Sequence, residues 1–229
     1  MIIHEDDRFI IINKPPFVAT LEDRNDPVNI LQLARVYHSN AKVCHRLDKE
    51  TSGILVVAKD DDAYKYFARL LEHREVTKMY HAIVSGRHEI EEQELDKPIY
   101  SSSNRSRIDF QQGKPSVTLI STLEIFSHHT LMACMPFTGR LHQIRVHLAD
   151  LGMPISGDEL YGGKYIYLSQ VKRNYHIGKD QEERPLMQRV SLHAAGISFE
   201  DMNGKSVSYK APYPKDMQAT ITQLAKNKI

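Results

Sequence analysis

The chain has 229 residues, of which 41% are hydrophobic and 26% charged, a balance typical of a folded globular protein. Its net charge is +1, so any basic face that binds nucleic acid has to be a local cluster. No apolar run approaches the ~20 residues that a membrane helix needs, and the N-terminus lacks the basic start and apolar core of a signal peptide. We therefore expect a cytoplasmic protein that does not enter a membrane.

Cys44 and Cys134 are the two cysteines of the chain, too few for a disulfide framework in a protein of this size. We expect both to be buried, reduced thiols. Cys44 directly precedes a polar segment, but His45 is its one neighbour there that favours a thiolate. We therefore do not expect Cys44 to be a nucleophile.

The first predicted elements are strands. The apolar run 9–12 follows acidic residues and ends at Asn13-Lys14-Pro15-Pro16, which predicts a hairpin of strands and then a rigid turn. Asp26-Pro27 is typical of a helix start. The helix that follows is expected to be amphipathic, with its apolar stripe at helical spacing: Ile30, Leu31, Ala34 and Tyr37.

The central segment reads His45-Arg46-Leu47-Asp48-Lys49-Glu50-Thr51-Ser52-Gly53 and continues directly into the apolar run 54–58. The apolar run predicts a short strand that is buried on both faces. The polar residues permit two interpretations. They form a tight turn whose side chains cap their own backbone, or they hold Asp48 as a reactive carboxylate with cations close on either side. The residues alone leave both interpretations open.

Helices and strands follow in mixed order. Asp60-Asp61-Asp62 predicts a helix start, with negative charge at the positive end of the helix dipole. Its buried stripe is expected to be Tyr64, Phe67, Leu70 and Leu71. Residues 76–85 are expected to form a strand, and residues 89–94, which hold four glutamates, a solvated turn.

The second half of the chain continues this pattern. Residues 117–126 and 131–137 predict two strands joined by a turn. A helix is predicted next, with one apolar face formed by Leu141, Ile144, Leu148 and Leu151 and an end at Gly152 and Pro154. Asn203-Gly204 lies between two alternating runs and predicts a hairpin. Strands and helices that do not alternate regularly predict an α+β fold, in a single domain over residues 1–229.

Five sequence blocks occur in a fixed order between residues 45 and 194. They are the segment 45–53 with its strand, Lys78-Met79-Tyr80-His81-Ala82, the run 138–148 (Thr-Gly-Arg-Leu-His-Gln-Ile-Arg-Val-His-Leu), Gly157-Asp158 with Tyr161-Gly162, and Leu192-His193-Ala194. Together they resemble the RNA pseudouridine synthases, in the branch of the large-subunit ribosomal RNA and dual-specificity enzymes. The resemblance implies a pseudouridine synthase fold: a long mixed, mostly antiparallel sheet with flanking helices and a central active-site cleft. Many relatives carry a small RNA-binding domain before the catalytic sequence, and we expect this chain to lack it.

The resemblance also implies the reaction. Uridine becomes pseudouridine when its C–N glycosidic bond breaks, the base turns, and C5 joins the same ribose carbon. Because no oxidation state changes, we expect no cofactor, and the sequence has no phosphate-binding loop or dinucleotide motif. The resemblance makes Asp48 the nucleophile, places Arg46 in the space left by the flipped uridine, and packs Tyr80 on the uracil, where it can take the proton from C5.

Further substrate contacts are expected from the matching blocks and from an irregular basic segment. Lys78, His142 and Gln143 lie in the blocks. Arg105 and Arg107 lie in the segment 101–107, which is either a mobile loop or an arm whose arginines bind RNA phosphates. A second candidate RNA surface is formed by Lys164, Lys172, Arg173 and Lys179. The expected partner is RNA, either ribosomal or transfer RNA, and we expect a monomer.

Arg145 is the third residue expected in the catalytic centre. A carboxylate in a cleft that excludes water needs a cation nearby to stay ionised. Since Arg46 is expected to face the RNA, we expect Arg145 to pair with Asp48 and to orient it. The alternative is that Arg145 pairs with Asp150 or with an RNA phosphate.

Three other classes of protein are disfavoured by the sequence. A metal enzyme is disfavoured because His142 and His147 are five residues apart, ~140° around a helix, unlike a zinc-binding pair at i and i+4. A glycoside hydrolase needs a second carboxylate, for which Asp158 is the candidate, yet nothing in the sequence raises its pKa and we expect it to be structural. A non-catalytic RNA-binding protein would tolerate the loss of Asp48, whereas here the segment around Asp48 is intact.

Overall fold

The structure, a computed structural model, describes residues 1–22, 28–173, 175 and 182–227. It divides into two compact units, unit 1 (Met1–Tyr80 with His193–Tyr213) and unit 2 (His81–Leu192 with Pro214–Ile229). The chain passes between the units after Tyr80, Leu192 and Tyr213, so neither unit is one continuous segment. The single domain expected over residues 1–229 stays a prediction.

Unit 1 consists mainly of strands that surround a buried hydrophobic core. Its elements are β1 (Ile2–Glu5), β2 (Phe9–Lys14), α1 (Ile30–Tyr37), β3 (Lys42–Val43), β4 (Ser52–Ala58), α2 (Asp61–Glu72), the start of β5 (Thr77–Ser85), most of β11 (Leu192–Glu200) and β12 (Ser206–Lys210). The strand order is β1-β2-β4-β11, followed by β5, with β3 on β4 and β12 on β11. β4 pairs in parallel with β11 and antiparallel with β2 and β3.

All seven residues of β4 are buried, which confirms the strand predicted after the central segment. The hydrophobic core of unit 1 forms around it, with the rings of Phe9, Phe67 and Phe199 in edge contacts from β2, α2 and β11. Gly53 has a φ of +112°, and a Cβ there would lie 2.2 Å from the carbonyl oxygen of Ala194. The glycine of the central segment is therefore required by the close approach of β4 to β11.

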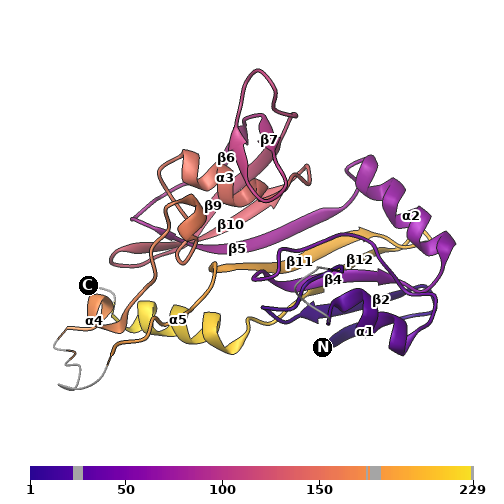
Figure 1. The fold of residues 1–229 in the computed structure, drawn as a ribbon, viewed down its shortest axis with the longest axis horizontal. Coiled ribbons are helices and arrows are strands. Elements are labelled where there is room, and N and C mark those ends of the chain that lie inside the picture. Colours follow the sequence, from indigo (N-terminus) through magenta and orange to yellow (C-terminus); the bar gives the residue numbers. More distant parts are fainter. Residues whose placement is uncertain (23–27, 174, 176–181, 228–229) are drawn as a thin grey trace. The chain divides into compact units, whose positions relative to one another are not determined.

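Unit 2 holds a second set of strands, a hairpin and the remaining helices. Its elements are the rest of β5, β6 (Gln93–Asp96), β7 (Ile99–Ser101), β8 (Ser106–Ile108), β9 (Val117–Ile125), β10 (His129–Pro136), α3 (Gln143–Asp150), the 3-10 helix η1 (Glu159–Tyr161), α4 (Leu168–Val171) and α5 (Lys215–Lys226). The strand order is β5-β10-β9-β6, and β7 pairs with β8 alone. α3 packs on β8, β9 and β10 (Figure 1).

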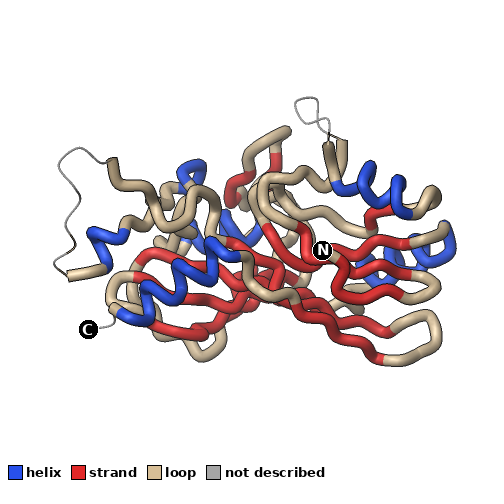
Figure 2. The backbone as a smooth tube through the Cα atoms, turned by 90° about the horizontal axis from the view of Figure 1, so that it is seen from below, coloured by secondary structure: helices blue, strands red, loops and turns tan. Residues whose placement is uncertain are grey.

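The structure confirms the predicted fold class. The strands form a mixed, mostly antiparallel sheet, and helices lie beside the strands (Figure 2). A cleft across the middle of the sheet stays a prediction. None of the helices in the described part of the chain is both long enough and apolar enough to cross a bilayer.

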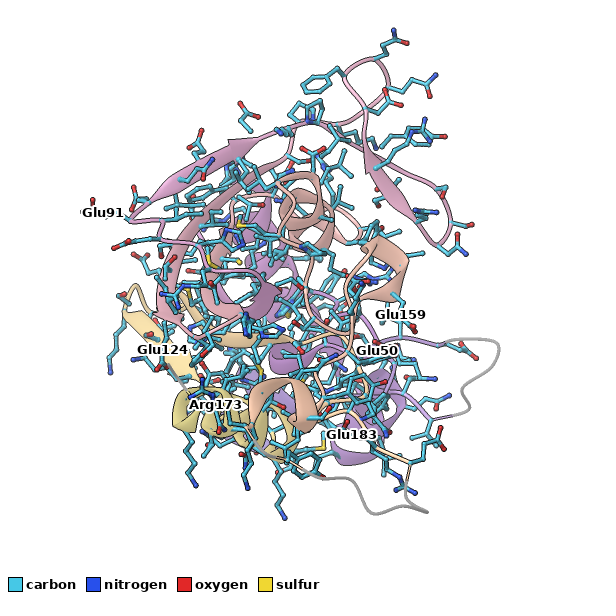
Figure 3. All side chains as sticks on the ribbon, turned by 90° about the vertical axis from the view of Figure 1, so that its left-hand side faces the viewer. Glu50, Glu91, Glu124, Glu159, Arg173 and Glu183 are labelled. Atoms are coloured by element: carbon cyan, nitrogen blue, oxygen red, sulfur yellow. The ribbon has the colours of Figure 1, made fainter. Side chains whose placement is uncertain are left out.

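Helix and turn predictions based on local chemistry are largely confirmed. Asp60 caps α2 by accepting a hydrogen bond from the amide of Ala63. β9 and β10 pair as expected, and β11 and β12 form the predicted hairpin around Asn203-Gly204. Glu91 is exposed and points outward (Figure 3), as expected of a solvated turn, although β6 begins within that segment. The helix start expected at Asp26-Pro27 lies outside the described residues, as does Lys179.

Three expectations were wrong. Tyr64 is exposed rather than part of a buried stripe, and its ring lies 5.5 Å from the Lys42 ammonium. Tyr37, expected on the apolar stripe of the first helix, is exposed too, and its hydroxyl donates to Glu5. Residues 101–107 are not irregular throughout, since β7 and β8 form a hairpin there. α3 does not have one apolar face, because residues 143–148 are all buried. The structure adds that the Asn29 side chain caps α1 at Ile30 and that residues 215–226 form α5, a helix for which no prediction was made.

Candidate active site

Asp48 lies at the start of a tight turn that precedes β4. The amide of Thr51 donates to the carbonyl oxygen of Asp48 over 3.0 Å, so the turn is closed by main-chain atoms and that bond does not use the Asp48 carboxylate. Asp48 is half-buried and follows the exposed Arg46 and the buried Leu47 in the sequence. Glu50, labelled in Figure 3, follows on the same turn. The predicted tight turn is therefore present, and the bond that closes it is made by main-chain atoms.

The residue before Asp48 is held by Thr20. The buried Thr20 hydroxyl donates to the carbonyl oxygen of Leu47 over 2.7 Å and accepts from the amide of Leu47 over 3.1 Å. One side chain thus satisfies both main-chain groups of Leu47, from a position 27 residues earlier in the sequence. The backbone that enters Asp48 is therefore fixed.

The residue after Asp48 is held by a buried lysine. The ammonium of Lys14 donates to the carbonyl oxygens of Pro15, Val18 and Lys49, over 3.0, 2.9 and 3.1 Å. The amide of Phe17 donates to the same Lys49 oxygen over 2.8 Å. Lys14 has 0% exposure, and its three hydrogen bonds match the three donors of an ammonium. We call the segment 14–20 the brace, because it fixes the backbone on both sides of Asp48.

His45 anchors the start of the same segment to β4. Its Nε2 accepts a hydrogen bond from the amide of Val56 over 3.2 Å, and its ring stacks on Phe67. Burial, together with the positive charge of Lys78, lowers the pKa of His45 to about 3. His45 is therefore neutral near pH 7 and acts as an acceptor rather than as a proton donor.

Tyr80 and Lys78 reach this region from β5, and both are half-buried. Burial raises the pKa of Tyr80, and the negative charge of Asp48 raises it further, so the two side chains sense each other electrostatically. Tyr80 is therefore a neutral phenol near pH 7, packed against the core of unit 1. Burial lowers the pKa of Lys78.

Arg145 makes a buried two-point ion pair with Asp158 in unit 2. Its Nε lies 2.7 Å from Oδ2 and its Nη2 lies 2.8 Å from Oδ1, and the side chains are 10% and 1% exposed. The guanidinium also lies over the Tyr161 ring at 5.1 Å. Asp150, the alternative partner considered for Arg145, pairs with Lys97. The expected pairing of Arg145 with Asp48 joins residues of different units and stays a prediction.

His142 and Gln143 lie at the start of α3. His142 adopts a left-handed backbone conformation, and its Nδ1 lies 2.8 Å from the Tyr161 hydroxyl, which accepts from the amide of Ser106. The Gln143 amide donates to Val117 and Thr118 and accepts from Thr138 and Arg140. Gln143 thereby fixes the loop before α3, and its contact with substrate stays a prediction.

Arg105 and Arg107 lie on the hairpin formed by β7 and β8, which we call the arm (residues 99–108). Both are exposed. Arg107 stacks on the Tyr100 ring at 4.5 Å and pairs with Asp109 at 2.8 Å, whereas Arg105 donates a long hydrogen bond to the carbonyl oxygen of Leu160. The arm is thus ordered by its own contacts and presents two guanidinium groups to solvent.

The surroundings of the two thiols and of His147 suit structural roles. Cys44 and Cys134 are free, and burial raises the pKa of each to about 12, as expected for unreactive thiols. His147 lies within hydrogen-bonding distance of Thr118 and of the carbonyl oxygen of Lys97. In the described ranges, no three His, Cys, Asp or Glu side chains gather as a metal site would require.

Sequence reasoning missed two parts of this site. Lys14 was interpreted as part of a turn, and its partners Val18 and Lys49 could not be predicted from the sequence. Thr20 gave no signal, because its partner is distant in sequence. Asp158 was expected to be structural, and the structure adds that the group it holds is Arg145.

The chain was compared with known proteins. A model of the RNA pseudouridylate synthase family matches residues 8–150. Ribosomal large subunit pseudouridine synthase D of Buchnera aphidicola subsp. Acyrthosiphon pisum (strain APS) is 33% identical over 233 residues, covering 97% of this chain and 73% of that protein. Ribosomal large subunit pseudouridine synthase C of Vibrio cholerae serotype O1 is 31% identical over 230 residues, covering 97% and 69%.

Solved structures show the same similarity. Human RNA pseudouridylate synthase domain containing 1 matches with a TM-score of 0.71 and 26% identity, over 93% of this chain and 83% of that chain. Human RNA pseudouridylate synthase domain containing 4 has the same fold, with a TM-score of 0.72 and 22% identity. The family match includes Arg46, Asp48, Tyr80 and Arg145.

The lowered pKa of His45 predicts a dependence of stability on pH. In the unfolded chain His45 has an ordinary pKa of about 6.5 and binds a proton below that pH. In the folded protein it binds this proton only near pH 3. The free energy of unfolding should therefore fall as the pH falls from ~6.5 towards ~3. His45→Gln keeps an acceptor for Val56 but removes this proton, and should lower the slope by up to about 1.4 kcal/mol per pH unit.

Urea unfolding at a series of pH values measures this slope. His73→Gln, at an exposed histidine that ends α2, serves as the control and should keep the wild-type slope. Equal slopes in wild type and His45→Gln would show that His45 is not buried as a neutral ring.

Proposed function

Since this chain belongs to the RNA pseudouridylate synthase family and is thus an isomerase that converts uridine in RNA to pseudouridine, we propose that it modifies large-subunit ribosomal RNA with Asp48 as its nucleophile. The substrate proposal is supported by the relatives named above, whose names refer to the ribosomal large subunit. The enzyme acts in the cytoplasm, as a monomer and without a nucleotide cofactor or metal.

The observation that supports Asp48 most directly is the brace. A reacting group has to be held close to its attack geometry, and a misplacement of about 1 Å can cost ~100-fold in rate. Thr20 and Lys14 fix the backbone immediately before and after Asp48. The turn itself closes through a main-chain hydrogen bond, so the backbone that carries Asp48 is fixed on both sides.

The reaction balances without any added reactant. The ionised Asp48 attacks the sugar or the pyrimidine ring, and the bond from N1 to the ribose carbon breaks. After the base turns, C5 bonds to the same ribose carbon, the bond to Asp48 breaks and releases the carboxylate, a proton leaves C5, and N1 gains one. Arg46, exposed beside Asp48, fills the space left by the flipped uridine.

Tyr80 packs on the uracil and accepts the proton that leaves C5. Because its raised pKa keeps it a neutral phenol, Tyr80 can accept that proton only as it passes its own proton on. Tyr80 therefore passes a proton on as it accepts one, and it is not a phenolate before the reaction begins. The remaining proposed RNA contacts are Lys78, His142, Gln143, Arg105 and Arg107.

Arg145 keeps Asp48 ionised and oriented, and Asp158 keeps Arg145 in position. Desolvation in a closed site raises the pKa of a carboxylate, and a nearby guanidinium opposes that shift. The pair with Asp158 takes up Nε and Nη2, which fixes the plane of the whole guanidinium. Asp158 thus acts as a positioning residue for Arg145.

The proposed function is tested by release of tritium from a large-subunit rRNA transcript that carries 5-tritiated uridine, with a chelator present. We expect wild type to release tritium and Asp48→Asn, which keeps size but removes the charge, to release none while binding the RNA normally. Tritium release by folded Asp48→Asn would refute the nucleophile. Release from transfer RNA instead of the rRNA transcript would refute the substrate.

Arg145→Lys should lower turnover at least ~100-fold with little change in RNA affinity. An ammonium cannot reproduce the planar, two-point hydrogen bonding of a guanidinium to a carboxylate. Asp158→Asn should lower turnover in the same way, and the double variant should be no slower than the worse single one. Single-turnover rates and equilibrium RNA binding measure these effects.

Arg189→Lys is the matched control for this pair of variants. The buried Arg189 forms another two-point ion pair in unit 2, with Asp216, which is half-buried at the start of α5. The control should lose stability but keep its turnover per folded molecule. If Arg145→Lys lost stability alone, as we expect of the control, Arg145 would have no part in the reaction.

A further inference from the structure

A cavity of about 440 Å³ lies in unit 2 between the arm and α3. Its lining comes from the arm, from the last turns of α3 and from η1: Tyr100, Ser102, Arg105, Ser106, Arg107, Ile108, Val146, Ala149, Asp150 and Tyr161. We propose that this cavity binds one unpaired nucleotide of the substrate RNA, a neighbour of the target uridine. The proposal rests on the proposed function in that the ligand is part of the RNA that the enzyme modifies.

The walls of the cavity suit the flat faces of a base. Tyr100 and Tyr161 supply aromatic rings, and Ile108, Val146 and Ala149 supply apolar surface. Stacking of a base on an aromatic side chain typically contributes ~1–3 kcal/mol and tolerates any base, since each has a π-face. A volume of about 440 Å³ is at the small end of ligand pockets, too small for a helix or a folded peptide.

The rim of the cavity suits a phosphate. Arg105 and Arg107 are both exposed there, and guanidinium groups bind phosphate oxygens at two points. Arg107 is already stacked on Tyr100 at 4.5 Å, so it extends the aromatic surface as well as carrying charge. Asp150 carries the one negative charge among the lining residues, and Lys97 pairs with it.

Tyr161 connects the cavity to the residues proposed for catalysis. Its ring lines the cavity and lies 5.1 Å from the Arg145 guanidinium, and its hydroxyl lies 2.8 Å from His142. The arm is fastened to the same tyrosine by the amide of Ser106, and to α3 by the Ser106 hydroxyl, which donates to Leu141. A nucleotide in the cavity is therefore separated from Arg145 by one ring, as a neighbour of the target uridine in the RNA should be.

Photo-crosslinking tests the proposal without requiring catalysis. Large-subunit rRNA transcripts that contain 4-thiouridine or 6-thioguanosine are bound to the protein, irradiated and digested, and the crosslinked residue is identified by mass spectrometry. We expect crosslinks to Tyr100 or Tyr161 from at least one of the two probes. Ala149→Phe, which fills the cavity and removes no charge, should abolish them and weaken RNA binding about tenfold.

Ala219→Phe, at an exposed alanine of α5 outside the cavity, is the matched control and should keep both crosslinks and affinity. Crosslinks confined to residues that do not line the cavity, or crosslinks to Tyr100 or Tyr161 that persist in Ala149→Phe, would overturn the proposal. Tritium release by the same wild-type preparation reports on the proposed function separately. An enzyme that releases tritium but shows no cavity crosslinks would refute the cavity alone.

Discussion

The buried ammonium of Lys14 is the interaction on which the proposed site depends. An ammonium taken out of water costs several kcal/mol unless its donors find acceptors, and Lys14 finds three carbonyl oxygens within its own unit. One of them belongs to Lys49, the residue after Asp48. Lys14 therefore links the end of β2 to the turn that carries Asp48, and β2 pairs with β4, the strand that follows this turn.

In unit 2 the charge of Arg145, the proposed catalytic arginine, is likewise compensated by a partner from the same unit. Arg145 lies on a helix whose residues 143–148 are all buried, and Asp158 compensates its charge at two points. Tyr161 then ties that pair to His142 and to the arm. In each unit a charged group is oriented by a partner from the same unit, so each half of the proposed site is organised before RNA binds.

Elements whose cause is local could be predicted from the sequence, and elements fixed by distant partners could not. β4 follows from its apolar run and α2 from the cap at Asp60. The arm gave no periodic signal because its second strand is fastened by Tyr161, 55 residues away from Ser106. Asp48 and Tyr80 were identified by resemblance rather than by periodicity, whereas the contacts of Lys14 and Thr20 with the turn required the fold.

The central claim is that the brace holds Asp48 in a reactive position, and the turnover of Thr20→Val tests it most directly. The substitution keeps the shape of the side chain and removes the hydroxyl that binds Leu47 at both main-chain groups. Thr130→Val is the matched control, since Thr130 is also buried and also bonds two main-chain groups, of His88 and Gly86, in unit 2. We predict that Thr20→Val lowers the single-turnover rate per folded molecule at least ~10-fold without changing RNA affinity, while Thr130→Val does not. Equal rates for the two variants and wild type would contradict the account.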